Sequence, residues 1–202
     1  MMKVFVEFLC ICLSVTIVQI NVRAKEICDV TRGEMASKVV QAMEEVVEVE
    51  YGMPCFSYPP FKDLTEGEYL ENKNILIAYS LGLMFGTGEG AFEPKEYITR
   101  AQSAAIFERL IKAIDDELYL KQTYIVLDEK YEDDEKIPLW AKESVYNMRW
   151  LKIIVGDENN RFNPQENLKE EHIDSILERI KNNYKIYHDK GRGNEEQYRI
   201  YI

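Results

Sequence analysis

Two four-residue segments of this 202-residue chain combine a helix start with a group that can bind an anion. They are Thr31-Arg32-Gly33-Glu34 and Thr99-Arg100-Ala101-Gln102. In each, the threonine can cap a helix by accepting from a backbone N–H three residues on, and the Glu or Gln side chain can reach back. The arginine then lies in the first helical turn, where its guanidinium and the helix dipole both suit a carboxylate. The pattern predicts anion sites at Arg32 and Arg100, although capping boxes also begin many helices that bind nothing.

The equivalent stretch near the end of the chain departs from this pattern. Lys169-Glu170-Glu171-His172 stands there, with Glu170 in place of the arginine. A carboxylate at that place would repel an anionic ligand, so we expect this third site to be inactive or altered.

The chain repeats itself with a spacing of about 70 residues. A third, partial copy precedes the two full ones, because Val30–Ala36 resembles Ile98–Ala104. The chain therefore consists of two and a half units, the first of which lacks its opening half. The two full copies align at the following positions: Phe61-Lys62-Asp63 with Tyr131-Glu132-Asp133, Gly86 with Gly156, Phe92-Glu93-Pro94 with Phe162-Asn163-Pro164, and Ile106–Arg109 with Ile176–Arg179.

Each full unit has the apolar spacing of two helices, separated by a turn rich in Gly or Asn. The first helix is expected over about 70–82 and 139–153, and the second after Ile98 and Leu168. Strand signals are weak except at 124–127 and 198–202. The glutamates at 44, 45, 48 and 50 indicate a solvated helix face rather than paired catalytic acids. The fold class predicted is all-α.

The order of these signals resembles the S-layer homology domain. The shared elements are Phe-Lys-Asp, an apolar helix ending at Leu81-Gly82, the Gly86–Gly90 turn, Phe-x-Pro and Ile98–Gln102, with a Pro-x-Trp-Ala stretch at Pro138–Ala141. The resemblance covers about residues 29–183. It implies tandem repeats in a pseudo-threefold helical bundle, the first repeat incomplete. It also implies a non-catalytic module that anchors an exported protein to cell-wall polysaccharide, commonly one that carries pyruvate ketals, at the bacterial surface.

The resemblance places the polymer-binding arginine in the Thr-Arg motif, and this strengthens the assignment of Arg32 and Arg100, with Thr31 and Thr99 beside them. Other candidates are weaker, because each also has a structural explanation. Gly86 and Gly88 can offer backbone N–H groups to a ligand or only permit the turn. Asp63 and Asp133 can accept from sugar hydroxyls or cap a loop. Trp140 can stack on a sugar face or belong to the core.

The N-terminus has the composition of a secretory signal, with Lys3, an apolar run from Val4 to Ile20 and a cleavage site after Ala24. The predicted organisation is a signal peptide at 1–24, a partial repeat at 25–60, a repeat at 61–124, a repeat with a degenerate motif at 125–183 and a tail at 184–202. Cleavage leaves Cys28 and Cys55, which form either a disulfide or two thiols.

Composition excludes several classes of function. The 36 acidic and 25 basic residues give a net charge of −11, which argues against a nucleic-acid partner. The acidic segment 157–160 resembles a calcium-binding loop but lacks the glycine and the closing glutamate of an EF-hand, so we expect no metal site there. We also expect no cofactor and no catalytic residue, because the sequence has no spacing that specifies paired catalytic carboxylates. After signal cleavage no membrane span is expected. The alternative to wall binding is self-assembly or an adaptor role in the cell envelope, with a homo-oligomer formed through the face that the missing half-repeat leaves open.

Overall fold

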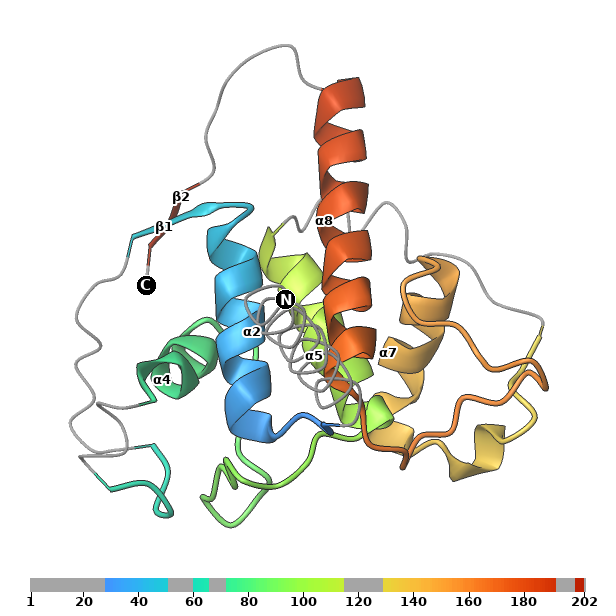
Figure 1. The fold of residues 1–202 in the computed structure, drawn as a ribbon, viewed down its shortest axis with the longest axis horizontal. Helices are drawn as coiled ribbons and strands as arrows, with labels where there is room; N and C mark the ends of the chain where they lie inside the picture. Colours follow the sequence, from blue (N-terminus) through green and yellow to red (C-terminus); the bar gives the residue numbers. More distant parts are fainter. Residues whose placement is uncertain (1–27, 51–59, 66–71, 115–128, 192–198, 202) are drawn as a thin grey trace, which may run out of the picture.

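The computed structural model describes residues 28–50, 60–65, 72–114, 129–191 and 199–201. These ranges contain five α-helices, one 3₁₀ helix and two three-residue strands (Figure 1). The fold is all-α, as predicted. The elements are α2 (Arg32–Glu44), β1 (Glu48–Glu50), α4 (Lys73–Ser80), α5 (Arg100–Ile114), η1 (Asp134–Lys136), α7 (Leu139–Trp150), α8 (Glu170–Gly191) and β2 (Arg199–Tyr201).

The second helices of the three units, α2, α5 and α8, share one centre with pseudo-threefold symmetry. The residues that precede them form a closed ring of backbone hydrogen bonds. Val30 N–H donates to Leu168 O at 2.9 Å, Leu168 N–H to Ile98 O at 3.1 Å, and Ile98 N–H to Val30 O at 2.9 Å. Each unit thus supplies one donor and one acceptor, and these three equivalent residues are all buried. The first unit completes the ring through Val30, which lies directly before α2.

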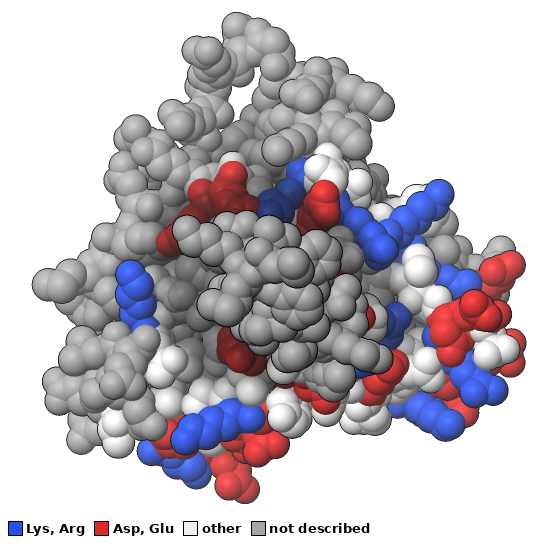
Figure 2. Space-filling model, in the orientation of Figure 1, with Lys and Arg blue, Asp and Glu red and all other residues white. Residues whose placement is uncertain are grey.

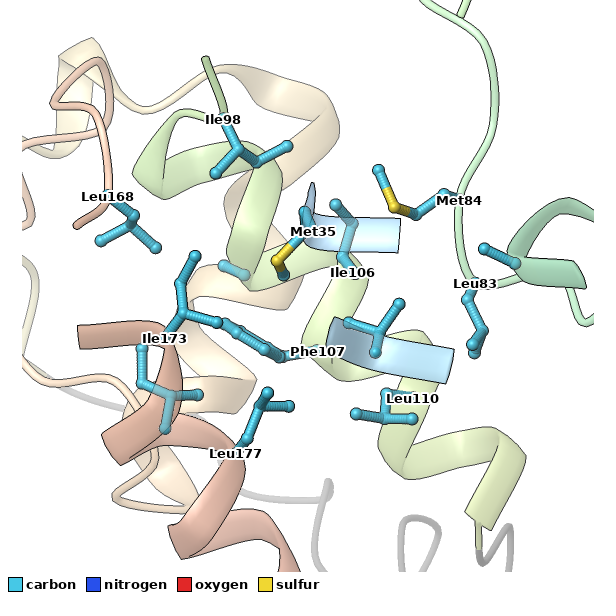
Figure 3. Packing of buried hydrophobic residues seen from close by; sticks show 14 of the residues in the cluster. Met35, Leu83, Met84, Ile98, Ile106, Phe107, Leu110, Leu168, Ile173 and Leu177 are labelled. Carbon is cyan, nitrogen blue, oxygen red and sulfur yellow. The ribbon is translucent and has the colours of Figure 1, made fainter. Parts of the chain in front are cut away.

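One hydrophobic core joins the three units. Phe107 of α5 is fully buried and lies between residues of the other two central helices (Figure 3). Met35 reaches it from α2, and Ile173 and Leu177 reach it from α8. Because each unit alone would leave its apolar face exposed, the units depend on their neighbours for stability.

The outer helices pack against the central helix of the preceding unit, α4 on α2 and α7 on α5. A buried carboxylate joins the second pair. Glu108 accepts from Ser144 Oγ at 2.5 Å and from Asn147 Nδ2 at 2.6 Å, and it is only 7% exposed. A charged acceptor satisfied by two donors from the facing helix fixes how α7 lies on α5.

The central helix α8 differs from α5 on the face that lies toward α2. Ala104 and Ile111 are buried in α5, whereas their counterparts in α8, Asp174 and Lys181, lie at a groove of about 620 Å³ between α8 and α2. Ion pairs cross this groove from Lys38 to Asp174 at 2.7 Å and from Lys181 to Glu45 at 2.6 Å. The charged side chains make this face compatible with water, as in the terminal repeat of a stacked array.

The structure departs from the expected boundaries in two places and confirms one strand signal. The acidic segment predicted as one helix face is divided, because α2 ends at Glu44 and Glu48–Glu50 form β1, where a β-branched valine favours a strand. β1 pairs in parallel with β2, which confirms the strand signal at the C-terminal end. α8 continues past residue 183 to Gly191 and projects beyond the other helices (Figure 1).

Several predictions fall on residues that the structure does not describe. These are the signal peptide at 1–24, Cys55 as the partner of Cys28, and the strand signal at 124–127. Cys28 itself is exposed. Within the described ranges, no helix has the length and apolar character needed to cross a membrane.

Candidate ligand-binding site

Arg32 is buried at the junction of the first two units, and its guanidinium has a fixed direction. Its Nε donates to Phe92 O at 2.7 Å and its Nη2 to Phe85 O at 2.9 Å. The guanidinium carbon lies 4.9 Å from the centre of the Phe92 ring, in a cation–π contact. Only 5% of the residue is exposed. The side chain therefore joins the start of α2 to the turn of the next unit.

Burial lowers the pKa of Arg32, and the nearby carboxylates of Glu93 and Asp63 oppose this shift. An arginine starts from so high a pKa that it stays charged at neutral pH. Its Nη1 has no hydrogen-bond partner among the described residues. One edge of the guanidinium is thus held by the protein, and the other can bind a ligand.

Arg100 repeats this geometry one unit later. Its Nε donates to Phe162 O at 2.7 Å and its Nη2 to Val155 O at 2.6 Å, and its guanidinium carbon lies 5.1 Å from the centre of the Phe162 ring. The Thr-Arg motif therefore starts a helix and also connects its unit to the next one.

Both threonines form the capping boxes that the sequence predicts. Thr31 Oγ1 accepts from Glu34 N–H at 3.3 Å, and Glu34 Oε2 accepts from Thr31 N–H at 2.8 Å. Thr99 and Gln102 make the same pair of bonds, at 3.3 and 3.0 Å. These hydroxyls start α2 and α5 and so place the two arginines.

Asp63 and Asp133 hold the turns whose carbonyls receive the arginines. Asp63 accepts from the N–H groups of Phe92 and Glu93 at 2.8 and 2.7 Å. Asp133 accepts in the same way from Phe162 and Asn163 at 2.7 and 2.8 Å. Burial opposes ionisation of Asp63, but hydrogen bonds from backbone N–H groups, together with the charge of Arg32, outweigh it, and the pKa of this carboxyl lies below its ordinary value.

A cleft of about 380 Å³ opens beside Arg32 and gathers residues from all three units. Arg32 comes from the first unit, Gly86 from the turn of the second, and Trp140 from the start of α7 in the third. Trp140 is 60% exposed, so it is a wall of the cleft and not a core residue. The other lining residues are Met84, Phe85, Thr87, Gln102, Ala105, Ile106 and Arg109.

The cleft is positively charged although the chain is acidic. The described residues of its lining include two arginines and no Asp or Glu. Arg109 donates through Nη1 to Leu83 O at 3.3 Å and lies over the Phe85 ring at 4.9 Å from the ring centre. Two guanidinium groups flanked by Phe85 and Trp140 suit a ligand that combines an acidic group with a flat sugar face.

Gly86 is needed at the floor of this cleft for steric reasons. A Cβ atom there would lie 2.5 Å from Ala91 O and 3.2 Å from the Phe61 ring. Gly88 has a φ of +110°, and a Cβ atom added there would meet nothing within 4 Å, so its role in the turn is conformational.

The structure thus brings Arg32, Gly86 and Trp140 together, with Thr31 directly before the arginine. Asp63 lies beside a separate hollow of about 430 Å³ that Glu93 and Glu96 also line. Glu170 accepts from Lys38 Nζ at 3.2 Å and so serves the contact between α8 and α2. Phe85 and Arg109 were not among the predicted site residues. The recurrence of Arg109 as Arg179 was the available signal, but spacing alone does not show that it lies beside Arg32.

Among the described residues, no three His, Cys, Asp or Glu side chains gather in an arrangement that would hold a metal ion.

Comparison with known proteins identifies the repeat. The sequence pattern of the S-layer homology domain matches residues 60–104 and 130–172. The chain is an S-layer homology domain protein. The two matched segments begin next to Phe61 and Tyr131, and each extends through the turn into the second helix of its unit.

Proteins with similar sequences are much longer than this chain. An endoglucanase of Bacillus sp. (strain KSM-635) is 30% identical over 133 residues, which are 64% of this chain and 13% of that protein. An amylopullulanase of Thermoanaerobacterium thermosulfurigenes is 30% identical over 138 residues, 68% of this chain and 7% of the relative. Cell surface glycoprotein 1 of Acetivibrio thermocellus is 25% identical over 151 residues, 75% and 6% of the two chains. The S-layer homology chain therefore spans a small part of each relative.

Proposed function

We propose that this chain is a non-catalytic module that retains an exported protein at the bacterial surface by binding an acidic cell-wall polysaccharide in the cleft beside Arg32. One observation carries the proposal. The cleft presents two guanidinium groups and an exposed tryptophan, and none of the described residues that line it is a carboxylate. An acidic sugar, such as one carrying a pyruvate ketal, has the carboxylate and the ring face that these groups recognise.

The charge of the rest of the molecule supports a local mode of binding. The chain has a net charge of −11, and on the face in Figure 2 basic and acidic side chains lie next to each other. Long-range attraction of an anionic polymer is therefore weak, and binding depends on donors placed at short range. Arg32 is well suited to this role, because two backbone carbonyls fix its direction before any ligand arrives.

Similarity to the three relatives supports a place at the cell surface. The same repeat occurs in a protein named as a cell surface glycoprotein and in two much longer enzymes. By this similarity we take the repeat to serve as an anchor in the present chain. No catalytic role is proposed for the present chain.

Self-assembly through the open face has less support than wall binding. Seven of the ten described residues that line the groove between α2 and α8 have charged or amide side chains, and the ion pairs of Lys38 and Lys181 cross it. A stable homodimer interface is normally more apolar than this surface.

Binding to purified bacterial cell walls tests the proposal. The protein is incubated with walls before and after mild acid removes their pyruvate ketals, and the bound fraction is measured. We expect binding to the untreated walls only. Trp140→Ala should reduce it, whereas Leu139→Ala, at an 89% exposed neighbouring position outside the cleft lining, should not. Equal binding to both wall preparations would contradict an acidic-sugar ligand.

A further inference from the structure

The repeat allows the surroundings of Arg32 and Arg100 to be compared position by position. Both arginines make the same two backbone bonds and the same cation–π contact. The residues around them differ. With a spacing of 70 residues, Val155 takes the place of Phe85, and Asp157 takes the place of Thr87.

Phe85 and Trp140 form aromatic walls beside Arg32, whereas the residue that takes the place of Phe85 beside Arg100 has no ring. Phe85 packs edge-on against Tyr79 with ring centres 6.1 Å apart, and it carries Arg109 on its face. Val155 offers no ring. The chain has two tryptophans, and Trp140 already lines the cleft at Arg32. The other, Trp150, is the last residue of α7 and has no counterpart in position to Trp140. A sugar beside Arg100 therefore lacks a tryptophan at the position that Trp140 takes beside Arg32.

The electrostatic surroundings also favour an anionic ligand at Arg32 over one at Arg100, because Asp157 takes the place of Thr87. Asp157 accepts from the N–H groups of Asn159 and Arg161, both at 2.9 Å, and from Asn163 Nδ2 at 3.0 Å. The bond from Arg161 N–H contributes most to keeping the pKa of Asp157 below its ordinary value, so this carboxylate is charged at neutral pH. Both arginines interact with carboxylates of the protein, Arg32 with Glu93 and Asp63 and Arg100 with Glu166, Asp157 and Asp133, but only Arg100 has a carboxylate at the place that Thr87 takes beside Arg32. Among the described residues, the lining of the cleft beside Arg32 contains no carboxylate.

We propose that the chain binds a single acidic sugar, at Arg32, and that Arg100 only docks the turn of the third unit onto the second. This inference rests on the proposed function and specifies it further. According to this inference, Phe85 and Trp140 distinguish Arg32, which binds a ligand, from Arg100, which only connects two units. It also means that multivalent attachment to a polymer does not arise within one copy of this chain.

A pair of equivalent substitutions tests the inference. Phe85 and Val155 are 48% and 49% exposed and occupy the same place in successive turns. Phe85→Glu and Val155→Glu each introduce a carboxylate beside one of the two arginines. Isothermal titration calorimetry with a hexopyranoside carrying a 4,6-pyruvate ketal measures stoichiometry and affinity for the wild-type chain and both variants. Circular dichroism melting shows that each variant is folded.

We expect one site per chain in the wild type, at least tenfold weaker binding in Phe85→Glu, and unchanged binding in Val155→Glu, because a carboxylate in the cleft repels the carboxylate of the sugar. Trp140→Ala serves as a second variant for the Arg32 cleft if Phe85→Glu does not fold. Two sites per chain, or a loss of affinity in Val155→Glu equal to that in Phe85→Glu, would overturn the inference and leave the proposed function intact. Absence of any binding by the wild-type chain would overturn both.

Discussion

The substitution Asp133→Asn tests whether the aspartate really holds the turn that receives Arg100. Asp133 is 5% exposed, and its two carboxylate oxygens accept from Phe162 N–H and Asn163 N–H at 2.7 and 2.8 Å. An asparagine has one acceptor oxygen, so its NH₂ group must face the second N–H. One charged hydrogen bond, a contribution of about 1.5–3 kcal/mol, is lost, and a buried donor is left without a partner. We expect a loss of about 2–4 kcal/mol in the free energy of unfolding.

This loss is a large part of the roughly 5–15 kcal/mol that stabilises a typical protein. It should lower the melting temperature by roughly 4–16 °C for a chain of this size. Urea unfolding followed by circular dichroism measures it. Asp63→Asn is the matched control, because Asp63 makes the same two bonds but is exposed, and water can solvate the freed N–H. A loss below 1 kcal/mol for Asp133→Asn, or a larger loss for Asp63→Asn, would refute the reasoning.

Three further predictions concern the same turns. Gly86→Ala should destabilise the protein by about 1–3 kcal/mol, measured by urea unfolding, because the added Cβ would lie 2.5 Å from Ala91 O. An unchanged midpoint of urea unfolding would show that the turn can move to accept the Cβ. Tyr131→Phe should leave stability unchanged or raise it at pH 7, since its buried hydroxyl has no partner among the described residues and Phe61 stands at the equivalent place. Burial raises the pKa of Tyr131 to about 12, so the wild type should lose stability as pH rises from about 10 to 12, and the variant should lose less in a pH series of melting curves. Because the pKa of Asp63 is lowered in the folded protein, stability should fall as pH drops below about 4. Asp63→Asn should make this loss of stability with falling pH less steep, which the same series of melting curves measures at acid pH.

The sequence was sufficient for the fold class, the repeat and the positions of the capped helices. Thr, Arg and Glu or Gln at fixed spacing act within one helical turn, so their geometry follows from local rules. The same holds for the apolar faces: Ile106 and Leu110 of α5, and Ile176 and Ile180 of α8, are all buried as their spacing predicts.

The sequence did not predict the two bonds that tie Arg32 to the next unit, because they depend on how separate units pack. Its partners, Phe85 O and Phe92 O, lie 53 and 60 residues away and are backbone atoms, which leave no mark in the residue pattern. The same is true of Trp140, whose place in the cleft depends on how α7 packs on α5. The charged face of α8 could have been found by aligning it with α5, since Asp174 and Lys181 replace Ala104 and Ile111.

The most direct test of acidic-sugar binding at Arg32 is a ¹H–¹⁵N NMR titration of the two tryptophan side chains. The chain has two indole N–H groups, and the spectrum of Trp140→Ala assigns them. Trp140 lines the cleft, whereas Trp150 is at the end of α7 and outside that lining. On addition of a hexopyranoside with a 4,6-pyruvate ketal, the Trp140 signal should shift and saturate, and the Trp150 signal should stay in place. The same sugar without its ketal should have little effect. A Trp140 signal that does not move, or that moves equally with the uncharged sugar, would contradict binding of an acidic sugar in this cleft.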